Sequence, residues 1–321
     1  MTLPTVAVVI CAYTQQRWGD LQAAVESAKR QPESTEVIVV IDHEPELLRR
    51  AAARWPELQV VANDEERGLS GARNTGVALA QSDVVAFLDD DAAADADWLM
   101  HLVEALDLPD VVGVGGRAIP SWPADTGAGP YPDELLWIVG CSYAGLPTAP
   151  GDVRNVIGSS MAFRRDVLLA AGGFRSGIGR VGNQPLGCEE TELCIRIAQM
   201  RPEARIRYEP RSNVSHRVSP DRVTMRYLRR RSYYEGISKA VLSRRVGARD
   251  SLSSESTYLT RVLPGALLRE LGALGRGGGM RALAIVTSVV ATVTGYAVGR
   301  TLGTVVVRTP AAVPVPERAA V

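Results

Sequence analysis

Three consecutive carboxylates, Asp89-Asp90-Asp91, follow directly on the apolar segment 84–88. The apolar residues favour a buried β-strand, so the three acids lie where that strand ends. Adjacent anions repel one another and resist burial unless a cation neutralises them. Hard divalent cations such as Mg²⁺ or Mn²⁺ prefer oxygen ligands and often hold substrate phosphates as well. The pattern is therefore typical of a metal site, but a solvated acidic turn before a helix near Asp97 explains it equally well until other motifs are considered.

A second group of acids, Glu189, Glu190 and Glu192, begins an amphipathic helical segment after the glycine-rich stretch 177–187. The helix dipole favours negative side chains in the first turn. Such capping needs only one or two of the three acids, so a chemical role for one of them stays open.

The elements that must position these acids alternate between strand and helix over the first hundred residues. Continuous apolar, β-branched runs predict buried strands at 5–13 and 36–42, and a shorter strand at 58–62. This alternation predicts an α/β fold with a mainly parallel sheet flanked by helices. Ligands of such sheets bind at the carboxyl ends of the strands. Tyr13, Asp42 and the three aspartates all fall there.

The composition excludes few classes of protein. The 321 residues carry no net charge, so nothing indicates nucleic acid as a partner, although basic residues exceed acidic ones between 201 and 250. The four cysteines lack the spacing of a disulfide framework or a metal site, which indicates thiols in a reducing compartment. The first residues lack the features of a secretory signal.

Residues 120–150 are rich in proline and glycine, with Trp122, Tyr131, Trp137 and Tyr143 among them. Long irregular segments in compact domains are often functional. The aromatic residues therefore either pack locally or form an acceptor-binding flap, and the sequence leaves both open.

Through six motifs that occur in the same order, the chain resembles family 2 glycosyltransferases of the GT-A fold, which is a Rossmann-like α/β architecture. They lie at residues 8–13, 39–42, 68–76, 87–91, 171–174 and 187–193. The resemblance covers about residues 5–235. It implies an inverting, hexosyltransferase-type enzyme that uses a nucleotide-diphosphate sugar as donor and a divalent metal, Mn²⁺ or Mg²⁺, as cofactor.

The resemblance also implies roles at the donor site. Tyr13 and Asp42 match nucleoside-binding positions. Arg67 and Arg73 are expected to meet phosphate, and Arg73 with Asn74 matches the family pattern closely. The alternative for the glycines of this stretch is simply the start of a helix.

In the same way, Asp89 and Asp91 match the DxD positions that hold ribose and the metal, with Asp90 between them. His216 matches a position that supplies a further metal ligand in many GT-A enzymes. Imidazole suits divalent transition metals, which supports that role. A lone histidine with a structural role is the alternative.

Glu190 matches the position of the catalytic base, which is usually Asp in the family. Because Glu is longer than Asp by one methylene group, its carboxylate is shifted, and Glu189 is therefore the second candidate for the base. Arg175 stands at a position that is often acidic in the family, and this difference puts the acceptor specificity in doubt. Residues 229–236 lack the QxxRW motif of processive synthases. This absence argues for the transfer of a single sugar.

The C-terminal part contains a helical pattern at 263–274, a glycine-rich break at 275–279, and an uncharged segment at 282–299 between Arg281 and Arg300. Eighteen residues of helix span about 27 Å, just short of a hydrocarbon core. The segment is a marginal membrane span, an interfacial helix, or a helix buried in the fold or an oligomer. Membrane contact is favoured because the basic region 201–250 would also be attracted to anionic lipid.

We therefore predict a GT-A domain at 1–240, a helical, membrane-associated region at 241–308 and a disordered tail at 309–321. The predicted enzyme acts at the cytoplasmic face of the cell membrane on a lipid-linked or cell-envelope glycan acceptor. One alternative is a nucleotide-sugar-binding or scaffold protein without turnover. A sugar nucleotidyltransferase is less favoured, because residues 12–16 are not the glycine-rich, basic loop that such enzymes carry after the first strand.

Overall fold

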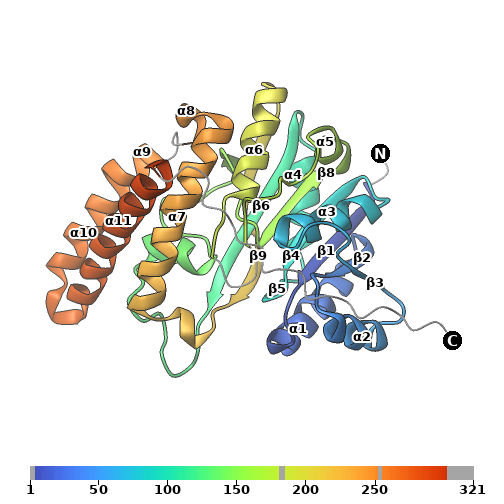
Figure 1. Cartoon of the computed structure of the whole chain (residues 1–321), viewed down its shortest axis with the longest axis horizontal. Coiled ribbons are helices and arrows are strands. Elements are labelled where there is room, and N and C mark those ends of the chain that lie inside the picture. Colours follow the sequence, from blue (N-terminus) through green and yellow to red (C-terminus); the bar gives the residue numbers. More distant parts are fainter. Residues whose placement is uncertain (1–3, 181–184, 252–254, 302–321) are drawn as a thin grey trace.

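The computed structural model describes residues 4–180, 185–251 and 255–301 (Figure 1). Within these ranges one sheet has nine strands in the order β3-β2-β1-β4-β8-β6-β9-β5, and β7 pairs with β9. The strands are β1 Val6–Ala12, β2 Ser34–Ile41, β3 Gln59–Ala62, β4 Val84–Asp89, β5 Ala92–Ala94, β6 Val111–Ser121, β7 Gly151–Asp152, β8 Ser160–Arg164 and β9 Arg205–Arg217. The α-helices around the sheet are α1 Trp18–Lys29, α2 Pro45–Arg54, α3 Leu69–Leu79, α4 Trp98–Leu106, α5 Arg165–Ala170 and α6 Glu189–Met200.

The predicted α/β fold is confirmed. Strands β1, β2, β3 and β4 form a parallel half, in which β1 lies between β2 and β4. The other half is mixed, because β8 runs antiparallel to both β4 and β6 while β6 and β9 are parallel.

Alternate side chains of β1 enter two different cores. Val8 and Ile10 belong to the core beneath α1, α2 and α4. Val9 belongs to the core on the opposite face, beneath α3, α5 and α6. Burial on both faces explains why the strand reads as a continuous apolar run. Each buried Val or Ile contributes about 1.5–3 kcal/mol.

Strand β9 is 13 residues long, and the sequence analysis does not predict it. Its composition is polar and basic, with buried and partly exposed positions in alternation. The strand pairs with β6 on one side and with β5 on the other, and the β5 register sets His216 beside Ala92. Tertiary pairing thus brings His216 to the end of the Asp89–Asp91 segment.

The C-terminal part is helical and packs at one end of the sheet (Figure 1). It contains α7 Met225–Val246, α8 Ala248–Ser251, α9 Glu255–Thr257, α10 Leu263–Gly272 and α11 Gly278–Thr301. Short turns of 3-10 helix (η1 Gln15–Arg17, η2 Asp133–Val139, η3 Pro220–Arg222, η5 Leu274–Arg276) and of π-helix (η4 Tyr258–Val262) complete the described chain. α7 continues through residue 240, where the sequence predicts a boundary. Residues 302–308 of the predicted helical region and the predicted tail 309–321 lie outside the described residues.

α11 lies along α7 at very short range. A Cβ atom at Gly295 would lie 2.0 Å from the carbonyl oxygen of Tyr233, and one at Gly236 would lie 2.0 Å from that of Thr292. Glycines permit this approach because they carry no side chain. By length and composition, α11 is the one described helix that could cross a membrane, and 39% of its most apolar window is buried in the protein.

Segment 120–150 is more ordered than its proline content suggests. η2 contributes Leu135 and Ile138 to a third core that also includes residues of α7, α10 and α11. Trp122 stacks on the buried ring of Tyr131. These two aromatic residues follow the local-packing interpretation, whereas Trp137 and Tyr143 line the cavity described next.

Candidate active site

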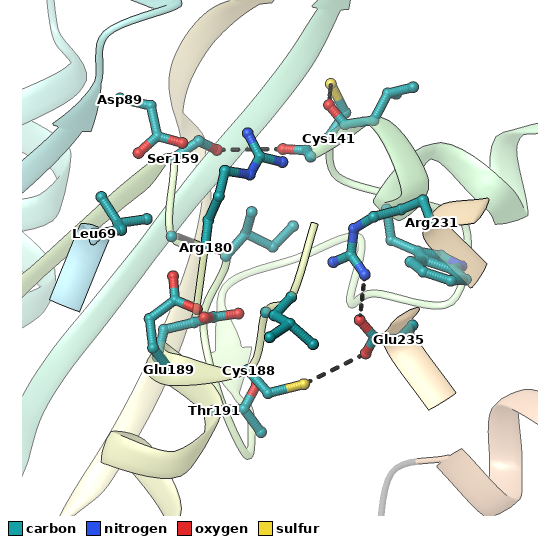
Figure 2. Close-up of a pocket in the computed structure, with 18 of the residues that line it drawn as sticks. Leu69, Asp89, Cys141, Ser159, Arg180, Cys188, Glu189, Thr191, Arg231 and Glu235 are labelled. Carbon is teal, nitrogen blue, oxygen red and sulfur yellow. Dashed lines mark hydrogen bonds and ion pairs between the residues drawn. The ribbon is translucent and has the colours of Figure 1, made fainter. Parts of the chain in front are cut away.

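A cavity of about 490 Å³ opens at the carboxyl ends of β1 and β4 and continues toward α7 and α11. Figure 2 shows Asp89 and Glu189 on one side of this cavity and Arg231 and Glu235 on the other. Its lining combines the predicted donor-site residues of the sheet with the first turn of α6. The two acidic groups singled out in the sequence therefore share one cavity.

Asp89, Asp91 and His216 form a potential metal site. One ligand atom from each lies within 4.8 Å of the other two. His216 Nε2 lies 3.1 Å from Asp91 Oδ1, and both residues are buried. Two carboxylates and an imidazole are a donor set that suits a divalent transition metal such as Mn²⁺. The residues present thus fit the predicted cofactor.

The charges around Asp91 keep it ionised. Burial opposes its charged form, but His216, Arg17 and Arg222 outweigh burial and hold the pKa of Asp91 well below its usual range. Arg17 Nη1 lies 3.0 Å from Asp91 Oδ2, and Arg222 Nη1 lies 3.4 Å from the same oxygen.

Asp90 differs from Asp91 in its titration. Arg17 donates a 2.8 Å hydrogen bond to Asp90 Oδ1. Burial, together with the charges of Asp91 and Asp89, nevertheless raises the pKa of Asp90 to about 7. Its second oxygen, Oδ2, is buried and has no hydrogen-bond partner within the described chain.

Arg73 connects the two acidic groups. Its guanidinium donates to Glu189 Oε1 at 3.0 Å and to the carbonyl oxygen of Gly158 at 3.0 Å, and lies 3.4 Å from Asp89 Oδ1. The side chain is only 2% exposed. Its charge is therefore engaged mainly by the protein's own carboxylates, which it holds at fixed positions.

Glu190 follows Glu189 in the first turn of α6 and lines the cavity. Burial is the main cause that raises its pKa, to about 8, and the neighbouring charge of Glu189 acts in the same direction. A carboxylate whose pKa lies near the working pH is suited to accept a proton.

Asp42 organises the turn before α3. Its Oδ1 accepts hydrogen bonds from Asn63 at 2.7 Å and lies 2.9 Å from His43 Nδ1, and its Oδ2 accepts from the amide of Gly68 at 3.0 Å. Gly68 has φ +130° and is the N-terminal cap of α3. The glycine stretch therefore includes the start of a helix, which was the alternative to a phosphate-binding role. Tyr13 and Asp42 both line the cavity.

The other two residues predicted in this region make contacts with the backbone. Arg67 donates to the carbonyl oxygen of His43 at 3.2 Å. Asn74 forms a reciprocal pair with Phe174, with both hydrogen bonds at 2.8 Å. Gly173, at φ +65°, has no room for a Cβ atom, which would lie 2.5 Å from Asn74 Oδ1. The pair explains why motif 68–76 accompanies motif 171–174.

Several cationic residues of the cavity are absent from the sequence-based prediction. They are Arg17, Arg154, Arg180, Arg222 and Lys239. Arg180 is half-buried and reaches into the cavity in Figure 2, and its guanidinium has no carboxylate partner among the described residues. For the residues after 201 the sequence signal is the basic excess of that region, which does not indicate which side chains turn inward, and no such signal marks Arg17, Arg154 or Arg180.

Comparison with protein families gives a match for residues 7–170 to the model of glycosyl transferase family 2. This match spans half of the chain. The chain belongs to glycosyl transferase family 2. It is therefore a GT-A enzyme that transfers a sugar from a nucleotide sugar.

Curated relatives and solved structures agree with this membership. The glucosyl-dolichyl phosphate glucuronosyltransferase of Haloferax volcanii is 36% identical over 242 residues, which cover 74% of this chain and 77% of the relative. A mannosyltransferase of Pyrobaculum calidifontis, solved with GDP-Man and Mn²⁺, superimposes with a TM-score of 0.58 at 18% identity, over 92% of this chain and 88% of that one. GalNAc-T7, solved with UDP, GalNAc and Mn²⁺, gives a TM-score of 0.55 at 17% identity, over 81% of this chain and 58% of that one.

Proposed function

We propose that this glycosyltransferase moves one sugar, with inversion at the anomeric carbon, onto a hydroxyl of a lipid-linked glycan at the cytoplasmic face of the membrane. The observation that carries the proposal is the shared cavity, in which the Asp89–Asp91–His216 group and Glu190 both take part. A transfer reaction needs a place for the donor diphosphate and a base for the acceptor in the same cavity.

The donor lies at the carboxyl ends of the parallel strands in this proposal. Tyr13 and Asp42 contact the nucleoside, and Asp89, Asp91 and His216 hold Mn²⁺ or Mg²⁺. The bound cation supplies charge neutralisation for the departing diphosphate. Arg180 adds a guanidinium, which suits phosphate because of its planar set of donors. Arg73 positions Asp89 and Glu189 rather than the donor itself, since those carboxylates already engage its charge.

Glu190 is the general base of the proposed reaction. The acceptor oxygen forms a bond to the anomeric carbon, the bond from that carbon to the diphosphate oxygen breaks, and the hydroxyl proton passes to the Glu190 carboxylate. Glu189 is less suited to this role, because its Oε1 accepts a hydrogen bond from the buried Arg73. That oxygen is therefore already engaged by the protein.

A lipid-linked acceptor agrees with two observations. The relative from Haloferax volcanii is described as acting on glucosyl-dolichyl phosphate. Among the residues that the structure describes, nine of the fourteen exposed large apolar side chains lie between residues 259 and 293. Surfaces of this kind mark membrane or protein interaction sites.

An interfacial position suits α11 better than a membrane span. Its glycine contacts tie it along α7, and α7 carries the basic run Arg229-Arg230-Arg231. Charged side chains are costly in the bilayer centre. α11 therefore presents its outer apolar face to the membrane while its inner face stays on α7.

The test is release of nucleoside diphosphate from a panel of UDP- and GDP-sugars, with a short-chain isoprenyl phosphate-linked sugar as acceptor, with and without Mn²⁺. We expect Mn²⁺-dependent release that requires the acceptor, and a product with inverted anomeric configuration by NMR. Donor binding by calorimetry without transfer to any acceptor would favour a binding protein instead. Release of pyrophosphate from sugar phosphate and nucleoside triphosphate would indicate a nucleotidyltransferase.

A further inference from the structure

In its part next to α7 the cavity contains five charged side chains that the transfer step does not use. Arg154, Arg231, Glu235, Lys239 and Glu255, here called the ionic cluster, line its part next to α7. Arg231 Nη1 lies 2.8 Å from Glu235 Oε2, and Arg154 binds Glu255 with both terminal nitrogens at 2.6 and 3.0 Å. Lys239 contacts both glutamates.

The ionic cluster holds more positive than negative charge. Three cations face two carboxylates, and their side chains are only 14–21% exposed. Three neighbouring groups do not supply the missing anion near neutral pH. Burial raises the pKa of the Cys188 thiol well above its usual value, likewise raises the pKa of Tyr143, and raises the pKa of Glu190 to about 8. Excess charge away from water is costly unless a partner compensates it. The cluster therefore suits a ligand with a single negative charge.

The same cavity leads from the ionic cluster to the outer apolar surface. Leu259, Leu263, Val289 and Val293 line this part of it. Leu259 is 47% exposed and Val293 is 59% exposed, so both also belong to the surface. Val293 continues a stripe on α11 formed by Leu283, Val286 and Val290 at helical spacing. An apolar chain can thus leave the cavity onto that stripe without crossing polar residues of the sheet.

At its other end the ionic cluster adjoins the first turn of α6. Cys188 Sγ lies 3.5 Å from Glu235 Oε1, and a Cβ atom at Gly187 would lie 3.0 Å from Arg231 Nη2. Glu190 lies two residues further along the same turn. A group bound at Arg231 is therefore adjacent to the proposed base.

We propose that the ionic cluster binds the phosphate of the acceptor, a phosphodiester that joins a sugar to a long hydrocarbon chain. The sugar lies toward Glu190, and the chain leaves between Leu259 and Val293 onto the α11 stripe. A phosphodiester carries one negative charge, which matches the excess charge of the cluster. This inference depends on the proposed function, because it identifies the acceptor's place in the same cavity.

The experiment varies the charge of the cluster and measures binding of geranylgeranyl glucosyl phosphodiester to the full chain by calorimetry in detergent. Lys239→Gln removes the excess charge, and we expect it to weaken binding by roughly tenfold or more, the effect of one lost charge-assisted hydrogen bond. The double variant Lys239→Gln/Glu255→Gln restores the excess charge, so binding should return to within a few-fold of the wild type. Arg226→Gln is the matched control, because Arg226 is exposed on α7 outside the cavity.

Two truncated probes separate the phosphate from the chain. Geranylgeranyl glucoside, which lacks the phosphate, should bind weakly and equally to wild type and Lys239→Gln. Methyl glucosyl phosphodiester, which lacks the chain, should be insensitive to Val293→Glu, whereas the full probe should bind this variant more weakly. If inorganic phosphate competed as well as the full probe, the cluster would be an anion site without a lipid and the proposal would be overturned.

Failure of this inference is distinguishable from failure of the proposed function. Stabilisation of the wild type by Mn²⁺ with UDP or GDP in a thermal shift assay reports the donor site alone. Donor binding together with unchanged probe affinity in Lys239→Gln would refute the acceptor site only. No transfer from any donor would refute the proposed function regardless of the lipid result.

Discussion

At the scale of single residues, the potential metal site depends on Asp91, which contacts His216, Arg17 and Arg222 together. We predict that Asp91→Asn reduces turnover roughly a hundredfold or more, since a metal contributes several kcal/mol of transition-state stabilisation. Chelation with EDTA should abolish turnover of the wild type, and Mn²⁺ should restore it. Initial rates of diphosphate release measure both effects.

Asp95→Asn is the control for this substitution, because Asp95 is exposed four residues further along the chain. Equal activity of Asp91→Asn and Asp95→Asn would remove Asp91 from the metal site.

Glu190 gives a prediction about pH. The base acts as a carboxylate, and its pKa is raised to about 8, so kcat/KM should rise with pH to a midpoint near 8. Glu190→Gln should eliminate transfer while donor binding persists. Glu189→Gln should move the midpoint downward, because the charge of Glu189 helps to raise the pKa of Glu190. If kcat/KM of Glu190→Gln still rose with pH in the same way, another group would be the base.

At the scale of elements, the contact of α7 with α11 depends on glycine. In Gly295→Ala the new Cβ atom would meet the carbonyl of Tyr233 at 2.0 Å, and a backbone carbonyl cannot move aside without displacing its helix. We predict a loss of about 1–3 kcal/mol in the free energy of unfolding, measured in urea.

Gly265→Ala in α10 is the matched control, since nothing lies within 4 Å of its Cβ position. It should be neutral or stabilise the protein by up to about 1 kcal/mol, because alanine favours helix. Equal stabilities of the two variants would show that α7 and α11 adapt to the added methyl group.

At the scale of the whole molecule, the position of the apolar surface predicts membrane binding. We expect the protein to sediment with vesicles that contain anionic lipid, and to do so less at high salt, since each basic residue near such a surface contributes about 1 kcal/mol. Val290→Asp, on the outer stripe of α11, should weaken binding roughly tenfold, because burial of a valine contributes about 1.5 kcal/mol or more.

Leu169→Asp is the control, because it adds the same charge on α5, a helix that packs on the sheet, at a residue that is 49% exposed. It should leave vesicle binding unchanged. If both variants bound equally well, the α11 stripe would not be the membrane contact.

The sequence alone determined the parallel half of the sheet and the first turn of α6. Buried parallel strands read as continuous apolar runs, and carboxylates at strand ends are visible as motifs, so 84–91 and 187–193 could be interpreted locally. The sequence did not identify β9, because strand pairing rather than apolar pattern stabilises its polar residues.

Only the tertiary structure decided which charges meet. Arg73 links Asp89 to Glu189, residues one hundred positions apart, and Asn74 similarly holds the backbone of Phe174. The ionic cluster joins α7, α9 and the segment before β8, and its position next to Glu190 follows from the packing of α7 against α6. Long-range electrostatic partners depend on how elements pack, which neither spacing nor composition along the chain contains.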